Sequence, residues 1–357
     1  MAIQPIGQRL IHSLQSEPPD QTALVEIAQA DPEAYRAFGI TSETIEAAIA
    51  KRLQLLALIQ PDLEQFCQQT LGWPSLPLET AWTLWLPLAQ WICKRQIEQD
   101  SPLIQGILGG QGTGKTTLAI ILSRILVQLG QRVCQLSIDD VYLTFAERQC
   151  LLTQAPELVW RGPPGTHDVA LAKATLAQLA ATGSAMLPRF DKSAWDGQGD
   201  RTTPEPVTDI TVVLFEGWFV GMGPLPPERF ESSQLPKLPW PIETSADLDF
   251  ARRSNERLQA YLPLWDQLDQ LIVLKPADYQ LSQQWRRQAE QTMRAQGKPG
   301  MSDAQINDFV TYFWRSLHPE LFLPPLTGHS DAPDRAAELV VDLDANHAPQ
   351  RIYSPSH

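Results

Sequence analysis

The spacing of apolar residues changes near residue 100. Before that point apolar positions recur at helical spacing, and no segment alternates as a strand does. Asp31 before Pro32 marks a helix start, and residues 41–58 and 78–97 are patterned as helices, the second of them rich in tryptophan. We therefore predict an all-helical N-terminal region over residues 1–98.

From residue 101 onward, short apolar runs alternate with helical stretches. The runs are residues 103–108, 132–138, 210–215, 270–274 and 339–343. This alternation is typical of a parallel sheet with crossover helices, and a run as apolar as T-V-V-L-F favours a sheet covered on both faces. We predict an α/β domain of this kind over residues 99–357, in which the proline-rich residues 223–241 form an irregular loop.

The segment after the first predicted strand is the most informative part of the chain. Gly109 to Thr116 reads G-G-Q-G-T-G-K-T, which matches the Walker A pattern, and a helical run follows it. Glycines allow successive N–H groups to face phosphate oxygens, and the start of the helix adds partial positive charge. An ordinary glycine-rich turn would not require Lys-Thr at these positions. The predicted P-loop comprises Gly109, Gly110, Gln111, Gly112, Thr113, Gly114, Lys115, Thr116 and Thr117, with Lys115 on the β- and γ-phosphates and Thr116 on Mg²⁺.

Carboxylates end the next two predicted strands. One strand leads into S-I-D-D-V-Y, which contains Asp139 and Asp140, and the other ends at Glu216. Carboxylates at the C-terminal ends of parallel strands face the ligand crevice. We predict that Asp139 is the catalytic base for an acceptor hydroxyl and that Asp140 supports it or assists magnesium; alternatively the pair only caps a helix. Glu216, in the Walker B position, is predicted to hold Mg²⁺.

Polar and basic residues are dense in the loops between these strands, over residues 156–205. Four cations in short proline- and glycine-rich loops predict a pocket for a small anion, although each alone reads as a solvated loop charge. For His167 two roles stay open: it binds substrate, or it is only part of a helix start that Asp168 caps. The candidate substrate-binding residues are Asp140, Tyr142, Arg161, His167, Asp168, Arg189, Asp191, Lys192 and Arg201.

A helix after the fourth predicted strand carries Arg287 and Arg294, seven residues apart on one face with Glu290 between them. Arginines in this place are typical of a lid that closes over transferring phosphates, here residues 283–303 with 297–300 as its mobile end. The alternative is an exposed helix with i,i+3 and i,i+4 charge pairs.

Composition narrows the classes of partner. The formal net charge of −13 disfavours non-specific nucleic-acid binding and docking on anionic membranes, because both need a basic surface. No signal peptide or apolar run long enough to span a bilayer is evident. The four cysteines lack metal-ligand spacing and predict reduced thiols in a cytoplasmic protein.

Taken together, the motifs resemble the P-loop kinases of the phosphoribulokinase, uridine kinase and pantothenate kinase group, and most of all the D-glycerate 3-kinases of plants and cyanobacteria. The resemblance covers about residues 100–345. It is carried by the Walker A segment, S-I-D-D-V-Y at Ser137, R-G-P-P-G-T-H-D at Arg161, P-R-F-D-K-S at Pro188, L-F-E-G-W at Leu214 and M-R-A-Q-G-K-P-G-M-S-D at Met293.

This resemblance implies ATP- and Mg²⁺-dependent phosphorylation of D-glycerate at its 3-hydroxyl, with Asp139 as base, Glu216 as the magnesium ligand, and Arg286, Arg287 and Arg294 in the lid. Two other functions stay open: a kinase of the same group for a nucleoside, pantothenate or sugar phosphate, and a nucleotide-dependent switch. Arg161, Arg189, Lys192 and Arg201 all remain candidates to grip the substrate carboxylate, and Asn346 and His347 are hypotheses for the adenine contacts. The N-terminal region either packs beside the substrate loops or mediates self-association.

Overall fold

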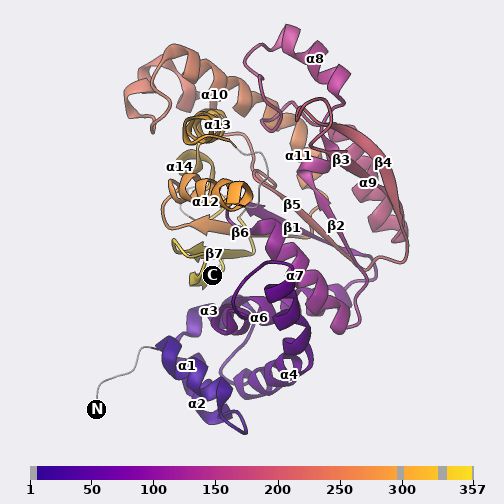
Figure 1. Ribbon diagram of the computed structural model, residues 1–357, viewed down its shortest axis with the longest axis vertical. Helices are drawn as coiled ribbons and strands as arrows, with labels where there is room; N and C mark the ends of the chain where they lie inside the picture. The colour runs from indigo at the N-terminus through magenta and orange to yellow at the C-terminus, as the bar shows by residue number, and fades with distance from the viewer. Residues whose placement is uncertain (1–5, 296–300, 329–335, 356–357) are drawn as a thin grey trace.

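The computed structural model describes residues 6–295, 301–328 and 336–355. Its centre is a six-stranded sheet in the order β2-β5-β1-β6-β7-β8, and a separate hairpin pairs β3 with β4 (Figure 1). The strands are β1 Leu103–Gly109, β2 Val133–Ser137, β3 Ala185–Asp191, β4 Asp200–Val207, β5 Val212–Gly217, β6 Gln270–Pro276, β7 Leu339–Leu343 and β8 Pro349–Tyr353.

Five strands of the central sheet are parallel, as predicted, and each coincides with a predicted apolar run. β8 was not predicted, and it pairs antiparallel with β7, so the sheet is mixed rather than wholly parallel. Because β5 lies between β2 and β1, the C-terminal ends of these three strands are adjacent. Ser137 at the end of β2 is in register with Glu216 on β5, and Leu108 on β1 is in register with Gly217.

Helices cover both faces of the sheet, which explains why its strands are apolar throughout. On β1 and β5, Leu103, Ile107, Val212 and Leu214 join one buried cluster, whereas Ile104, Leu108, Val213 and Phe215 join the other. The first cluster also contains apolar residues of α7, Lys115–Gln128, and of the N-terminal helices. The second contains residues of α9, Val169–Thr182, α10, Ser245–Leu258, and α11, Leu262–Trp265.

The N-terminal region is entirely helical where it is described, as predicted. Its helices are α1 Ile6–Gln15, α2 Gln21–Ala30, α3 Pro32–Ala37, α4 Ile45–Gln69, α5 Leu78–Thr80 and α6 Leu86–Ile97, with a π-helical segment, Ala81–Trp85, joining the last two. Asp31 caps α3 as predicted. α4 starts later than predicted, because Thr41 to Thr44 form a hydrogen-bonded turn, and it continues to Gln69 because Leu63 and Phe66 extend its buried face.

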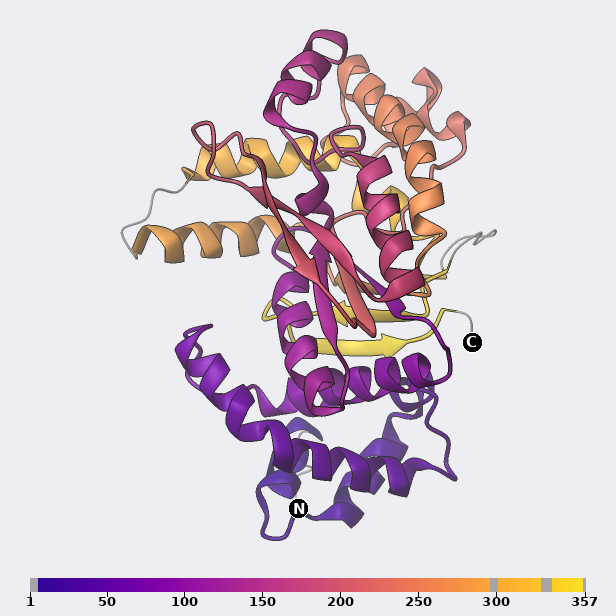
Figure 2. The same cartoon turned by 90° about the vertical axis from the view of Figure 1, so that its right-hand side faces the viewer.

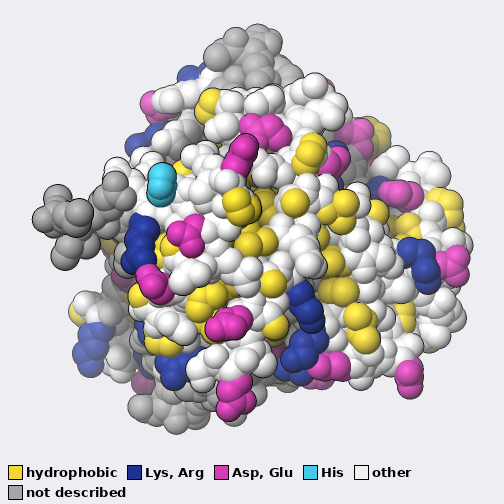
Figure 3. Space-filling view, turned by 90° about the horizontal axis from the view of Figure 1, so that it is seen from below, with side chains coloured by type: hydrophobic (Ala, Val, Ile, Leu, Met, Phe, Trp, Pro, Cys, Tyr) yellow, Lys and Arg dark blue, Asp and Glu magenta, His cyan; other side chains and the backbone are white. Residues whose placement is uncertain are grey.

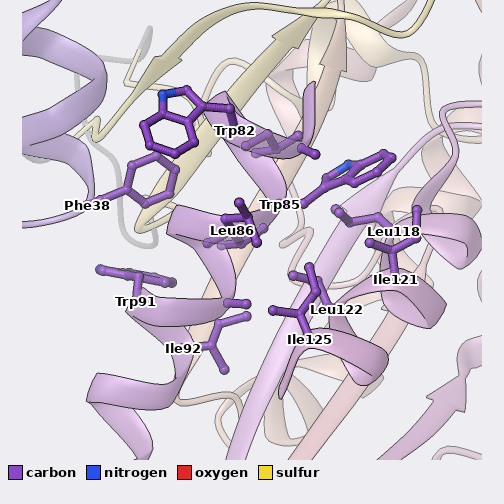
Figure 4. Close-up of a cluster of buried hydrophobic side chains, with 14 of the residues drawn as sticks. Phe38, Trp82, Trp85, Leu86, Trp91, Ile92, Leu118, Ile121, Leu122 and Ile125 are labelled. Atoms are coloured by element: carbon purple, nitrogen blue, oxygen red, sulfur yellow. The ribbon is translucent and has the colours of Figure 1, made fainter. Parts of the chain in front are cut away.

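These N-terminal helices pack beneath the sheet through α7 (Figures 1 and 4). Trp85 and Leu86 approach Leu118 and Leu122 of α7. The region lies at the opposite end of the molecule from α8, Phe145–Gln154, and from the β3–β4 turn (Figure 2). The alternative in which it packs beside the substrate loops is therefore wrong. Self-association stays a prediction. On the face seen from below, apolar side chains alternate with charged side chains of both signs (Figure 3).

Two other segments differ from the expected loops. Residues predicted as polar loops form the β3–β4 hairpin, whose strand pattern is hidden by Pro188, Pro204 and Pro206; a two-stranded ribbon tolerates them because half of its N–H groups need no partner. The predicted loop 223–241 contains two short 3₁₀ turns, Pro227–Phe230 and Ser232–Lys237. The remaining helices are α12 Leu281–Ala295, α13 Asp303–Ser316 and α14 Pro319–Phe322. Among the described helices, none is long and apolar enough to cross a bilayer.

Candidate active site

The P-loop joins β1 to α7 in the geometry that its glycines require. Gly112 and Gly114 adopt φ angles of 76° and 83°, in the region that favours glycine, and Gly114 caps α7. At Gly109 a Cβ atom would lie 2.4 Å from the hydroxyl oxygen of Thr113, and that hydroxyl donates to the Gly110 carbonyl at 2.9 Å. The loop is therefore closed on itself, with its N–H groups and the start of a 14-residue helix available to an anion.

Glu216 lies next to this loop, as the strand order requires. Its Oε1 accepts a hydrogen bond from the Thr116 hydroxyl at 3.0 Å. Its Oε2 is buried without a hydrogen bond, and the Lys115 ammonium lies 4.0 Å away. A buried carboxylate oxygen with an open coordination position, beside a hydroxyl, fits a Mg²⁺ ion that keeps waters and phosphate oxygens as its other ligands. The described residues form no group of three or more His, Cys, Asp or Glu that could hold a metal ion.

Asp139 and Asp140 follow β2 in a short 3₁₀ turn, Ile138–Val141. Asp139 Oδ1 accepts from the Tyr142 hydroxyl at 2.7 Å, and Oδ2 accepts from the Lys192 ammonium at 2.6 Å. Asp140 accepts from the Ser137 N–H at 2.9 Å and pairs with Arg189 at 3.2 Å. Thus Asp140 caps the turn, as the alternative interpretation held, whereas Asp139 accepts from Tyr142 at the end of the turn and from Lys192, which follows β3.

The charges around Asp139 decide its protonation. Burial opposes ionisation, but the ammonium of Lys192, with help from Tyr142 and Lys115, lowers the pKa of Asp139 from 3.8 to about 2. Burial raises the pKa of the Asp140 carboxyl, against the Ser137 N–H and Arg189. Burial beside Asp139 raises the pKa of Tyr142 well above 10, so the phenol stays a donor. The site therefore holds an ionised carboxylate that is electrostatically linked to the P-loop lysine.

The four candidate cations are not equivalent in the structure. Lys192 pairs with Asp139, Arg189 bridges Asp140 and Glu205, and Arg201 pairs with Asp168 at 2.8 Å. Arg161 donates to the Gly197 carbonyl at 2.7 Å and lies over the rings of Tyr142 and Phe190, at 6.0 and 5.6 Å. No carboxylate of the described residues lies within ion-pairing distance of Arg161.

The candidate substrate-binding residues Asp168, Asp191 and His167 also differ in their surroundings. Asp168 caps α9 by accepting from the Leu171 N–H at 2.9 Å, and Asp191 is exposed and holds a turn at Ser193. His167 is buried, stacked on Tyr142 at 4.6 Å, with its Nδ1 2.8 Å from the Tyr261 hydroxyl. Burial lowers the pKa of His167 from 6.5 to about 3, so the imidazole is neutral. Sequence reasoning missed Tyr261, since nothing in its local sequence marks it.

The predicted lid helix is α12, and its base packs directly on the P-loop. A Cβ atom on Gly112 would lie 2.7 Å from the Cβ of Trp285. Arg287 donates to Asn307 at 2.7 Å and Arg294 pairs with Asp303 at 3.4 Å, so both arginines face α13, as their seven-residue spacing predicts. Glu290 does not pair with either of them but with Arg286, at 2.5 Å. The predicted mobile end, residues 297–300, lies outside the described residues.

A cavity of about 590 Å³ opens beside the P-loop, on the side of α7 that faces the N-terminal region. Trp285 stacks on His347 at its rim, with ring centroids 4.2 Å apart, and His347 lies 2.7 Å from the Gly112 carbonyl. Its lining residues are Trp73, Pro77, Thr80, Leu84, Trp85, Gly112, Thr113, Gly114, Thr117, Leu118, Ile121, Leu274, Trp285, Gln288, Ala289, Leu343, Asn346 and His347. The structure thus places Asn346 and His347 beside the P-loop, as the adenine hypothesis requires. Sequence reasoning missed the role of Trp73 and Trp85 in this lining, because the only signal was the density of tryptophan in residues 73–91.

No protein-family model matches the chain. The chain is 35% identical over 263 residues to the chloroplastic D-glycerate 3-kinase of Arabidopsis thaliana. This alignment covers 70% of this chain and 54% of the plant protein, so the chain spans about half the length of that relative. It is 33% identical to an uncharacterized kinase, mug58, of Schizosaccharomyces pombe, covering 62% of this chain and 81% of that one.

A solved structure of D-glycerate 3-kinase from Cryptococcus neoformans is 30% identical and superposes with a TM-score of 0.65, covering 74% of this chain and 96% of that one. The chain belongs to the D-glycerate 3-kinase family. Membership in this family agrees with the arrangement of the P-loop, Glu216 and Asp139.

Proposed function

We propose that this chain transfers the γ-phosphoryl group of ATP to the 3-hydroxyl of D-glycerate, giving 3-phosphoglycerate and ADP. The observation that carries this proposal is that an ionised Asp139 and an arginine without a carboxylate partner among the described residues, Arg161, both contact Tyr142. Tyr142 connects them, because its hydroxyl binds Asp139 and its ring lies under the Arg161 guanidinium. A short substrate that carries a carboxylate and a hydroxyl matches this pair of groups.

In the proposed reaction the P-loop N–H groups and Lys115 hold the β- and γ-phosphates of ATP. Thr116 and Glu216 would hold Mg²⁺, which when bound neutralises charge on the phosphate oxygens. Arg161 binds the glycerate carboxylate and thereby directs the 3-hydroxyl toward Asp139. The hydroxyl oxygen attacks the γ-phosphorus, its proton goes to Asp139, and the bond to the bridging oxygen breaks to release ADP.

The remaining predicted residues take supporting roles in this proposal. Lys192 and Tyr142 orient Asp139, while the neutral His167 supports the Tyr142 ring from below. Arg189 and Arg201 hold the substrate loops through their ion pairs. The α12–α13 pair, with Arg286, Arg287 and Arg294, is the lid. The cysteines of the described chain are all unpaired thiols, which supports a reducing compartment such as the cytoplasm.

A coupled assay of ADP release tests the substrate. With ATP and Mg²⁺ present, we expect turnover with D-glycerate, little turnover with glycerol, which lacks the carboxylate, and 3-phosphoglycerate as the product by ³¹P NMR. No ADP release above the acceptor-free background with D-glycerate, alongside turnover of uridine or pantothenate, would overturn the assignment. Absence of turnover with every acceptor would favour a nucleotide-dependent switch.

The role of Arg161 is tested by Arg161→Met. Loss of a charge-assisted grip should raise KM for D-glycerate about ten- to hundredfold while KM for ATP changes little. Arg252→Met removes an arginine from exposed helix pairs on α10 and is the matched control. An unchanged KM for D-glycerate in the Arg161 variant would show that one of the other cations binds the substrate carboxylate.

A further inference from the structure

The cavity beside the P-loop has two kinds of wall. One is built by the kinase region and includes Gly112 and Thr117 of the phosphate loop. The other comes from the N-terminal helical region, through Trp73, Pro77, Thr80, Leu84 and Trp85. The P-loop and the N-terminal helices therefore line the same cavity, although strand β1 lies between them in the sequence.

Two tryptophans form the aromatic part of this wall. Trp73 and Trp85 lie with ring centroids 6.3 Å apart and planes inclined by 24°, an offset-stacked pair. Trp85 ends the π-helical segment Ala81–Trp85, and such segments often occur at functional sites because they change the direction of side chains within a helix. Figure 4 shows the Trp85 ring directed at Leu118 and Ile121 of α7, the helix that begins at the P-loop.

The shape and chemistry of the cavity indicate its occupant. Its volume of about 590 Å³ lies in the range of small-molecule sites, and it continues from Gly112 to Gly114, where the phosphates of a nucleotide would lie. Its walls are mostly apolar and aromatic, which suits the faces of a planar base, and the amide of Asn346 is a polar group at its rim. Because Gly112, Gly114 and Thr117 line the same cavity, a nucleoside joined to phosphates on the loop would lie next to this space.

We propose that the N-terminal helical region is a working part of the nucleotide site, in which the Trp73–Trp85 wall binds the base end of ATP. This inference rests on the ATP dependence of the proposed function but not on the identity of the acceptor.

Calorimetric titration of the full chain with Mg-ATP and, separately, with Mg-tripolyphosphate tests the proposal. Tripolyphosphate occupies only the P-loop, so it reports the phosphate site alone. In Trp73→Ala, whose side chain is partly exposed, we expect ATP to bind about three- to tenfold more weakly through lost stacking, with tripolyphosphate binding unchanged. In Thr80→Trp the added ring fills the cavity, and ATP should weaken at least as much.

Trp91→Ala is the control, because Trp91 belongs to the same buried cluster but does not line the cavity. Equal weakening of ATP by Trp91→Ala and Trp73→Ala, or equal weakening of ATP and tripolyphosphate, would show that general destabilisation is the cause and would overturn the proposal. Unchanged ATP affinity in both Trp73→Ala and Thr80→Trp would overturn it as well. If the wild-type chain bound no ATP, the proposed function itself would fail, which is a separate result.

Discussion

Replacement of Asp139 by asparagine is the most direct test of the proposed chemistry. Asparagine has nearly the same shape and keeps an oxygen that can accept from Tyr142, which now bonds to the carboxylate at 2.7 Å. It cannot accept a proton from the substrate, and it leaves the Lys192 ammonium without its partner. The substitution therefore removes the proposed base while it changes little else in the fold.

The size of the effect follows from the role of the carboxylate. General base catalysis contributes about 10²- to 10⁴-fold, or about 3–5 kcal/mol of activation free energy, and we expect kcat to fall by that factor. The pKa of about 2 also means that Asp139 stays ionised at any ordinary assay pH. Consequently the wild-type kcat should show no acid limb from this group between pH 5 and 7. A carboxylate with so low a pKa is a weak base, which suits a loose transition state in which the base mainly orients the hydroxyl.

Steady-state ADP release gives kcat, and titration with Mg-ATP gives nucleotide affinity for the same variant. We expect the loss to appear in kcat, with ATP affinity within about twofold of the wild type, because Asp139 is hydrogen-bonded to Tyr142 and Lys192 and acts on Lys115 of the P-loop only through its charge. A variant that kept more than a tenth of the wild-type kcat would refute the base assignment. Loss of ATP binding together with kcat would show instead that Asp139 supports the donor site.

Three further predictions use other parts of the structure. Lys115→Ala should abolish phosphoryl transfer to every acceptor, since the ammonium beside Glu216 is the proposed γ-phosphate contact; measurable ADP release would contradict the P-loop assignment. Burial lowers the pKa values of His167 and His318 to about 3 and about 4, so below pH 6.5 only the unfolded chain takes up these protons. Stability should then fall as the pH is lowered, by up to about 1.4 kcal/mol per pH unit for each imidazole, and urea unfolding of His167→Gln should show a smaller pH dependence than the wild type. Leu122→Ala on α7 removes a fully buried side chain from the cluster shared by the sheet and the N-terminal helices, so the free energy of unfolding should fall by about 2–5 kcal/mol; a loss below 1 kcal/mol would mean that this cluster is loosely packed.

Local patterns were sufficient for most elements of the fold. The five parallel strands, the N-terminal helices and the caps at Asp31 and Asp168 were predicted because each depends on periodicity or on a side chain within a few residues. The β3–β4 hairpin was not, since prolines in both strands interrupt the pattern that ordinarily marks a strand. β8 was also missed, because only Ile352 and Tyr353 of its five residues are buried, so it shows no apolar run of its own.

The sequence by itself determined which chemical groups are present: a phosphate loop, acidic residues that end strands, and cations in the loops between them. Only the tertiary structure decided which of these groups meet. The strand order places β5 between β2 and β1, so Glu216 reaches Thr116, which is 100 residues distant in sequence. Of the four candidate cations in the loops, folding paired Arg189, Lys192 and Arg201 with carboxylates of the described residues but placed Arg161 on a backbone carbonyl. It also brought a helical region that carries none of the kinase motifs against the P-loop. Such pairings depend on packing across the whole chain, which no local pattern of residues encodes.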